Sequence, residues 1–358
     1  MDIVATGMVC SVGLTAASAC AALRARVSGF KELPYLDGQG NPIVGARVPE
    51  VMPDFVKPGE RLVDLLTLAM GDCFRASPAA MPPKLPLVLG LAEADRPGGG
   101  AGLGELIIRE TERRTGLRFH ETLSRTIELG HTSGFHGLLE ARRVLNRSDV
   151  PVCLVCAVDS YINGRSLVWL EKLARLKTID NSDGVIPGEA AVCVLVRRPG
   201  EAGDGGGARV AGLGFARETA TVLNEEPLRG FGLAGAARSA LAEAGLAMHE
   251  VDFRLSDVTG ESYGFREFAL LEARLLRVRR DGMPFWHCAD AIGDTGAAAG
   301  LCQIVIADYA FRKDYAPGGR ALGVTSSVTE DRAAAVVVRC DVGQPAAARS
   351  GLARARSV

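Results

Sequence analysis

A short glycine-containing turn that opens a helix is the stretch of this sequence best suited to chemistry. Residues 128–137 read ELGHTSGFHG and run into a helical pattern, LLEARRVLNRSD. Enzymes place nucleophiles at such turns because the amide groups and dipole at a helix N-terminus stabilise negative charge. The side chain in the presenting position is the imidazole of His131, which raises the question of what a histidine does there.

The cysteines are a second group of reactive side chains, and their placement points to packing. Most of the nine lie inside apolar strand or helix patterns, as small core residues do. Cys153 and Cys156 are three residues apart on a strand-like run, so their thiols point to opposite faces. His287 and Cys288 are neighbours in FWHCAD, a pairing that is usually structural. The cysteines therefore favour neither a zinc site nor a redox pair, and we expect reduced thiols in the cytoplasm.

Composition and charge argue against two classes of partner. The 358 residues carry 41 Lys and Arg against 42 Asp and Glu, and no basic block interleaved with aromatics, which disfavours a nucleic-acid surface. The longest apolar runs, 152–158 and 190–196, are too short to span a bilayer. The N-terminus MDIVATGMV has no basic region or cleavage-site pattern, so we predict a cytoplasmic protein without a signal peptide or membrane partner.

The elements that must position His131 alternate between strand and helix. The strand patterns are continuous and rich in Val and Leu, which is typical of strands buried on both faces in an α/β protein. They cover 2–9, 85–93, 151–160, 190–198, 208–216, 251–260, 320–328 and 332–340. The helical patterns cover 15–27, 61–76, 102–116, 134–146, 166–176, 232–246, 263–278 and 296–312.

The same order of elements occurs twice along the chain. A Gly-rich linker or hairpin tip, PGEAGDGGGA at 199–208, separates the two occurrences. We predict an N-terminal half at 1–200 and a similar C-terminal half at 208–340. Residues 341–358 are rich in Ala, Arg and Ser without an apolar face, and we predict a disordered tail there.

Five motifs along the chain resemble those of one enzyme family. In order they are DIVATGMVCSVGLTAASACAALRARVSGF at the start, VCLVCAVDS at 152–160, NSDGVIPGEAAVCVLV at 181–196, SDVTGESYGFREFALLEA at 256–273 and GDTGAAAG at 293–300. Together they resemble the β-ketoacyl-ACP synthases of the thiolase superfamily, from residue 1 to about residue 340. The resemblance implies an α/β fold, the thiolase-like five-layered αβαβα sandwich of two similar halves.

The resemblance also identifies what is missing at the glycine-containing turn around His131, which we call the elbow. The family carries a cysteine nucleophile in "ACASG", and that position is His131 here. The family's two histidines, which bind the thioester carbonyl of malonyl-ACP, fall on Asp257 and Asp294. Its lysine falls near Ala289, and its C-terminal glycine loop reads SSVTEDRA. The resemblance therefore implies a homologue that has lost the whole condensing set.

Chemistry at these positions argues against condensation. An ionised aspartate only accepts hydrogen bonds, so Asp257 and Asp294 cannot donate to a thioester oxygen. Two aspartates also repel a malonyl carboxylate, by about 1 kcal/mol or more. Decarboxylative condensation needs donors at the developing enolate. An acyl group on His131 would be labile to water and a poor store for a chain awaiting condensation.

We weigh three interpretations of the pocket that the resemblance places around His131. A histidine with two carboxylates, Asp257 and Asp294, has the ligand types for a divalent metal. Alternatively an aspartate orients His131 as a general base for water, with Thr132, Ser133, Thr259 and Glu261 nearby. The third interpretation, which we favour, is a filled cleft in which His131 pairs with Asp257 or Asp294. We accordingly predict no metal and no cofactor.

The function predicted from this set is a pseudoenzyme that acts through another protein. It would be a chain-length-factor-like subunit or an adaptor, with a synthase, a carrier protein or a secretion effector as partner. One alternative is a diverged acyltransferase or thioesterase, 3-oxoacyl-ACP synthase-like, that uses His131, Asp257 and Asp294 or Cys288 on acyl thioesters. The other is an acyl-chain binding module. Function has to be argued from the site, and the family's site is absent.

The resemblance further implies a homodimer. In the family the strand before "DS" pairs with its mate across a twofold axis, and here that strand is VCLVCAVDS. Apolar residues on both of its faces fit a buried edge.

Overall fold

The computed structural model describes residues 1–49, 58–77, 81–99, 102–200 and 207–340. The strands are β1 (Asp2–Cys10), β2 (Lys31–Leu36), β3 (Pro42–Gly45), β4 (Leu87–Leu91), β5 (Arg125–Glu128), β6 (Val152–Ser160), β7 (Glu189–Arg197), β8 (Ala208–Arg217), β9 (Phe253–Ser256), β10 (Phe285–His287), β11 (Arg320–Ser326) and β12 (Asp331–Arg339). The helices are α1 (Ala16–Arg24), α2 (Pro58–Ala76), α3 (Gly104–Thr115), α4 (Ser133–Arg147), α5 (Gly164–Lys172), α6 (Phe231–Ala244), α7 (Ser262–Leu275), α8 (Ala289–Ile292) and α9 (Ala299–Arg312), with short 3₁₀ turns η1 (Gly130–Thr132), η2 (Met248–Glu250) and η3 (Gly296–Ala298).

The strands repeat one topology in the two halves. In the N-terminal half the order is β1-β7-β6-β4-β5, with β1–β7 and β7–β6 antiparallel and β6–β4 and β4–β5 parallel. In the C-terminal half β8-β12-β11-β9-β10 follows the same sequence of antiparallel and parallel pairings. The halves join at β1 and β8, where Asp2 pairs with Arg209. Two similar halves are thus present, as the resemblance implied.

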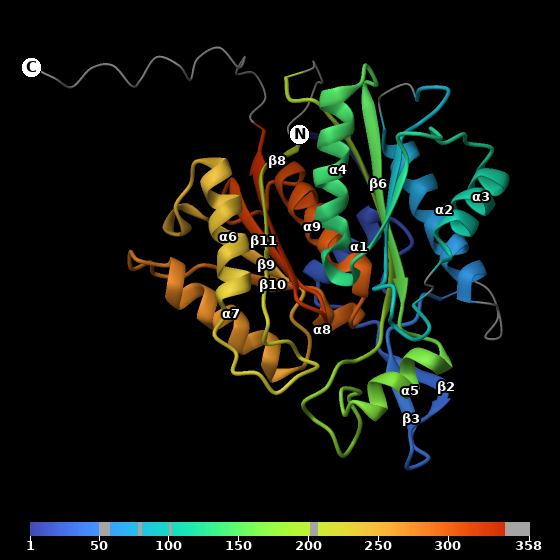
Figure 1. Cartoon of the computed structure of the whole chain (residues 1–358), viewed down its shortest axis with the longest axis vertical. Helices are drawn as coiled ribbons and strands as arrows, with labels where there is room; N and C mark the ends of the chain where they lie inside the picture. The colour runs from blue at the N-terminus through green and yellow to red at the C-terminus, as the bar shows by residue number, and fades with distance from the viewer. Residues whose placement is uncertain (50–57, 78–80, 100–101, 201–206, 341–358) are drawn as a thin grey trace, which may run out of the picture.

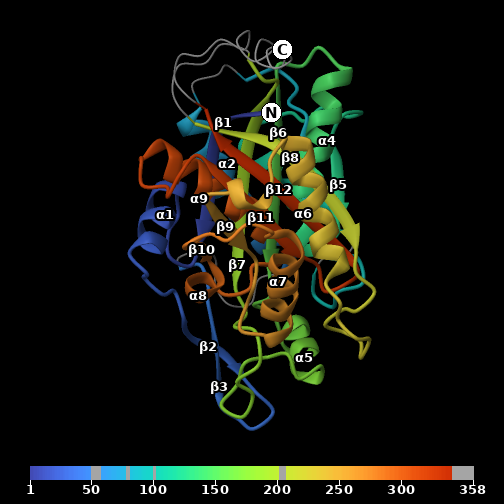
Figure 2. The ribbon, with the colours of Figure 1, turned by 90° about the vertical axis from the view of Figure 1, so that its left-hand side faces the viewer.

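Five layers result from this repeat. Helices α4 and α9 lie in the middle and contact strands of both halves. Helices α2 and α3 cover the outer face of the N-terminal strands, and α6 and α7 cover the outer face of the C-terminal strands (Figures 1 and 2). The hairpin β2–β3 and helix α5 extend from one end of the molecule (Figure 1).

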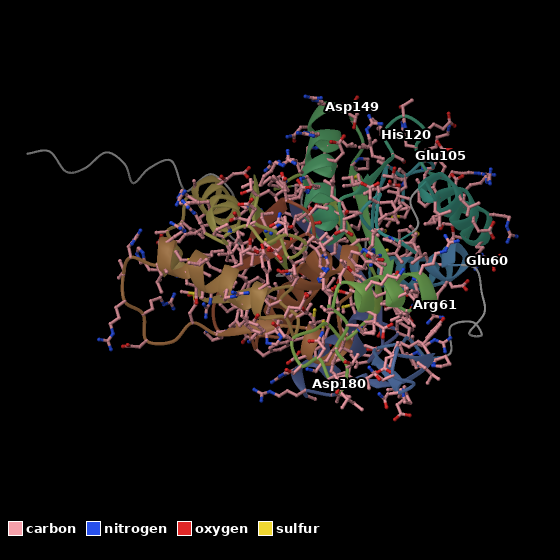
Figure 3. The ribbon with its side chains drawn as sticks, turned by 60° about the horizontal axis from the view of Figure 1, so that its bottom comes forward. Glu60, Arg61, Glu105, His120, Asp149 and Asp180 are labelled. Carbon is pink, nitrogen blue, oxygen red and sulfur yellow. The ribbon has the colours of Figure 1, made fainter. Side chains whose placement is uncertain are left out.

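Many charged side chains lie on the outside of these layers. Glu105 on α3, Asp149 after α4 and Asp180 after α5 are exposed and point away from the ribbon (Figure 3). Most of the interior is apolar: β6 is buried along its whole length, and so is all of β7 except its last residue. Buried charges, such as Asp159 of β6 and Glu189 of β7, lie at one end of these strands. The continuous apolar runs of the sequence therefore predicted strands covered on both faces correctly.

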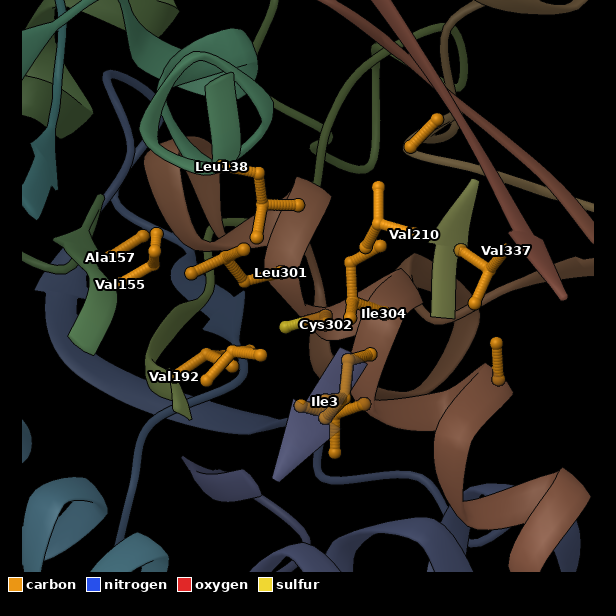
Figure 4. Packing of buried hydrophobic residues seen from close by; sticks show 14 of the residues in the cluster. Ile3, Leu138, Val155, Ala157, Val192, Val210, Leu301, Cys302, Ile304 and Val337 are labelled. Atoms are coloured by element: carbon orange, nitrogen blue, oxygen red, sulfur yellow. The ribbon is translucent and has the colours of Figure 1, made fainter. Parts of the chain in front are cut away.

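One hydrophobic cluster passes through the middle layer and joins the halves (Figure 4). Its members include, from α4, α9 and strands of both halves, Leu138, Leu301, Cys302, Ile304, Ile3, Val155, Ala157, Val192, Val210 and Val337. On the outer C-terminal face, Gly212 and Gly214 of β8 allow α6 to approach closely. A Cβ at either glycine would collide with a backbone carbonyl of that helix, at Ala240 or Ala236. Small residues on both elements therefore set their spacing.

The strand VCLVCAVDS does not lie where we expected. This strand is β6, and it is hydrogen-bonded on both sides, to β7 and to β4. A strand with both edges occupied cannot pair with a second copy, so the assignment of β6 as a dimer strand was wrong. Its apolar faces reflect helices above and below instead of a partner. The N-terminal half presents its edge at β5, which pairs with β4 alone.

The sequence patterns missed the hairpin β2–β3, the edge strand β5, the strand β10 and the short helix α8. The linker we predicted at 199–208 falls between β7 and β8, and its residues 201–206 lie outside the described residues, as does the predicted tail at 341–358. Within the described part of the chain, no helix combines the length and apolarity needed to cross a bilayer.

Candidate functional site

The elbow that carries His131 is built by a glycine and a serine. Gly130, with φ +55°, takes the left-handed conformation, and a Cβ there would collide with the carboxylate of Glu93. The hydroxyl of Ser133 accepts from the Leu129 amide at 2.9 Å. The turn between β5 and α4 is therefore locked, and His131 sits buried at its centre.

His131 lies between two carboxylates. Its Nε2 is 2.8 Å from Oδ1 of Asp294, and its Nδ1 is 3.8 Å from Oε1 of Glu93. Burial by itself would lower the pKa of His131, but the charge and hydrogen bond of Asp294, with Glu93, raise it well above the usual value. His131 is 4% exposed, so solvent does little to screen these charges. These contacts favour the protonated form of His131, which has no free lone pair for attack or for proton abstraction, over the neutral imidazole.

Asp294 is held by the backbone around it. Its Oδ1 also accepts from the Gly296 amide at 2.9 Å. Its own amide donates to the Ile186 carbonyl at 2.8 Å, and its carbonyl accepts from the Gly188 amide at 3.0 Å. Burial by itself would raise the pKa of Asp294. The charge and hydrogen bond of His131 outweigh that effect, so the pKa is lowered. Asp294 is thus a fixed acceptor beside His131.

Asp257 faces the same cavity but does not contact the imidazole through a hydrogen bond. It follows β9, and its Oδ2 accepts from the Ser326 amide at 2.8 Å. Burial raises the pKa of Asp257 to about 6, against the opposing charge of His131. The structure therefore brings His131, Asp257 and Asp294 together around one cavity, with Asp294 as the hydrogen-bonded partner.

The cavity itself is small. It has a volume of about 50 Å³, against the several hundred that a ligand site occupies. Arg175 lines it, and its guanidinium donates to both oxygens of Glu261, at 2.7 and 2.8 Å. Side chains of Val222, Leu233 and Val328 close the remaining sides. Side chains therefore fill most of the space beside His131, with room for a water or two.

A second group of charges, which sequence reasoning missed, supports the elbow from β4 and β6. Glu93 accepts from the hydroxyl of Ser327 at 2.7 Å, and the pKa of Glu93 falls to about 2, because its bonds and charges outweigh the effect of burial. Arg96 forms a buried ion pair with Asp159, and its guanidinium lies 3.9 Å from the Tyr161 ring centroid. Glu93 and Arg96 follow shortly after the buried strand β4. Two charged residues at the end of an apolar strand were the feature of the sequence that could have identified this group.

The remaining candidates lie away from the imidazole or have structural partners. Ala289 opens α8 and does not line the cavity. Thr132 donates its hydroxyl to the Leu129 carbonyl at 3.0 Å. Ser133 donates its hydroxyl to the Leu91 carbonyl at 2.8 Å. Thr259 and Glu261 line the cavity at its rim.

The described residues offer neither a thiol at the cavity beside His131 nor a group of ligands for a metal ion. None of the residues that line the cavity is a cysteine. Among the described residues, no group of three or more His, Cys, Asp or Glu side chains is arranged to hold a metal ion. His287 and Cys288 line a different, larger cavity.

Comparisons with known proteins give no match by sequence and clear matches by structure. No protein-family model and no curated protein matches the chain. The match to the structure of the ishigamide ketosynthase/chain length factor covers 95% of this chain and 99% of the matched chain, with TM-score 0.71 at 20% sequence identity. A ketosynthase in complex with its chain length factor from Xenorhabdus doucetiae covers 94% and 97%, with TM-score 0.71 at 13% identity.

The chain has the ketosynthase fold. A third structure agrees, a type II polyketide acyl-carrier protein in complex with its ketosynthase, with TM-score 0.76 at 14% identity and 94% and 98% coverage. Identities this low show the fold alone. The geometry of the elbow then decides what chemistry remains on that fold.

Proposed function

We propose that this chain is a non-condensing subunit of ketosynthase fold that acts by pairing with an active ketosynthase, as a chain length factor does. The observation that carries the proposal is the 2.8 Å contact between His131 and Asp294. A protonated imidazole whose Nε2 is hydrogen-bonded to Asp294, with the Glu93 carboxylate 3.8 Å from Nδ1, is neither a nucleophile nor a base. The elbow then has a structural role instead of a catalytic one.

Electrostatics around the elbow support the same proposal. Glu93, Asp257 and Asp294 all lie near His131, where an incoming malonyl carboxylate and the enolate formed from it would develop negative charge. Condensation needs hydrogen-bond donors at that place. Three acids around one imidazolium give a surplus of negative charge, which opposes both binding of malonyl groups and the transition state.

The small cavity argues against the acyl-binding alternative. A volume of about 50 Å³ holds no more than a few carbon atoms, so an extended acyl chain does not fit beside His131. An acyl-thioester hydrolase would need a neutral imidazole, and the carboxylates on both sides of His131 disfavour it.

The edge of the N-terminal half offers a place for the partner. β5 pairs with β4 only, and its first two residues, Arg125 and Thr126, are exposed. An unpaired edge of backbone amides and carbonyls is a template for a strand of another chain. Solved neighbours include ketosynthases together with chain length factors, which makes a heterodimer with a ketosynthase the favoured assembly over a homodimer.

Co-expression tests the proposal. The chain is produced with the ketosynthase encoded nearest to it, and assembly is measured by light scattering after size exclusion. We expect a one-to-one complex that elongates malonyl thioesters, while this chain alone neither decarboxylates nor hydrolyses them.

Two results would overturn the proposal. One is turnover of acetyl or malonyl thioesters by the isolated chain that His131→Ala abolishes, which would favour the hydrolase or acyltransferase. The other is an unchanged product distribution when the chain is omitted from the ketosynthase reaction.

A further inference from the structure

A larger cavity is lined by residues of α1, β10, α8 and α9. These four elements lie on one side of the molecule (Figure 2). Its volume is about 580 Å³, within the range of small-molecule sites. The end of β9 separates it from the central cavity, since Ser256 lines both. Nothing in the proposed function uses this space.

One side of this cavity is aromatic and aliphatic. Trp286 and Tyr315 line it, with ring centroids 6.4 Å apart, beside Leu23 and Ile306. The ring of Phe253 packs against that of Trp286, with the two centroids 4.6 Å apart, and so holds the indole in place. Half-buried rings fixed by packing form a ready surface for a flat apolar group.

Two of the side chains that line the cavity have polar atoms without partners. Gln303 is 2% exposed, and its Nε2 donates to the Val324 carbonyl at 2.9 Å, which fixes the amide and leaves Oε1 without a hydrogen bond. Nδ1 of His287 is also buried without one, because the nearest carboxylate oxygen, of Asp290, is 3.9 Å away. Buried polar atoms of this kind are uncommon in folded proteins and are satisfied when a ligand supplies the partner.

The rim of the cavity carries positive charge. Arg24 and Arg26 line it, both are exposed, and neither forms an ion pair with a described carboxylate. Arg24 lies 4.4 Å from the centroid of Tyr315, directly beside the aromatic wall. Of the described residues that line the cavity, Asp290 is the only acid.

We propose that this cavity is a binding site for a small organic anion that has an aromatic body and a hydrogen-bond donor. The body lies against Trp286 and Tyr315, the donor reaches the free Oε1 of Gln303, and the anionic group meets Arg24 and Arg26. The site is independent of the His131 elbow.

A pair of matched probes tests the proposal on the full chain. The sequence has two tryptophans, so Trp169→Phe leaves Trp286 as the sole reporter inside the cavity. 8-Anilinonaphthalene-1-sulfonate has an aromatic body, an N–H donor and an anion, whereas N-phenyl-1-naphthylamine lacks the anion. We expect the sulfonate to quench Trp286 fluorescence saturably with one site per chain, and the neutral probe to bind at least tenfold more weakly.

Variants then distinguish the contribution of the rim arginines to binding from that of Gln303. Arg24→Gln with Arg26→Gln should weaken the sulfonate at least tenfold and change the neutral probe less than twofold. Gln303→Leu should weaken both probes. Arg109→Gln with Arg238→Gln removes two exposed charges from α3 and α6 and should change neither. Absence of saturable quenching, or equal losses for both probes in the rim variant, would overturn the proposal, and circular dichroism melts verify that each variant is folded.

Discussion

Nε2 of His131 and Oδ1 of Asp294 lie 2.8 Å apart although 163 residues separate them in the chain. The pair joins the two halves, because His131 belongs to the elbow before α4 and Asp294 to the loop before α9. In an intact ketosynthase site, by the resemblance, these positions carry a thiol and an imidazole. Here the two side chains form a buried pair that fixes the elbow against the loop before α9.

Breaking this pair should destabilise the protein strongly. Asp294→Asn removes the hydrogen-bonded counter-charge of a buried imidazole and leaves the more distant Glu93, so we expect the free energy of unfolding to fall by about 3 kcal/mol. Urea denaturation at pH 7 measures the change. Asp180→Asn, which removes an exposed acid, should change the free energy by less than about 0.5 kcal/mol. A loss below that limit for Asp294→Asn would contradict the assignment.

Stability should fall as the pH rises above neutrality. The pKa of His131 is raised in the folded state, so its stabilisation is complete below the unfolded value of about 6.5 and is lost as the pH climbs toward the folded value. Between pH 7 and pH 9 the free energy of unfolding should decrease by up to about 1.4 kcal/mol per pH unit. His131→Gln should lose this part of the slope, and equal slopes for both proteins would refute the charged state of His131.

Restoring the thiol alone should not restore chemistry. In His131→Cys the new side chain faces Asp294, Glu93 and Asp257, and neighbouring carboxylates raise a thiol pKa and disfavour the thiolate. We therefore expect no acyl adduct with acetyl or malonyl thioesters and slow alkylation by iodoacetamide, both measured by intact mass.

The triple variant His131→Cys, Asp257→His, Asp294→His is the matched comparison. Its histidines remove two of the three acids, so the elbow thiol should be alkylated faster than in the single variant. Rapid acylation of His131→Cys on its own would show that the acids do not control the elbow.

A charge on the free edge should weaken assembly with the partner. Thr126→Lys places a cation on the exposed edge strand β5, and lysine on an edge opposes strand pairing with another chain. We expect affinity for the ketosynthase partner to fall about tenfold, or about 1.4 kcal/mol. Thr122→Lys, on an exposed turn just before β5, should bind normally. Equal affinities measured by light scattering or calorimetry would exclude β5 as the contact.

Much of the fold was predictable because the spacing of apolar residues along the sequence indicates which segments are buried. Continuous Val and Leu runs identified β1, β4, β6 and β7, and helical spacing identified α4 and α9. The short strands β5 and β10 were missed because three or four residues carry too little pattern. The position of β6 was misjudged because apolarity on both faces does not reveal which strands flank it.

Local patterns were enough to identify the alternation of strands and helices, the absence of a thiol at the elbow and the acids at Asp257 and Asp294. The folded chain was needed to show that Asp294 binds His131, that Glu93 lies near its other nitrogen and that a separate cavity opens beside Trp286. Burial and helix formation depend on neighbours a few residues apart, whereas these contacts depend on how distant loops cross.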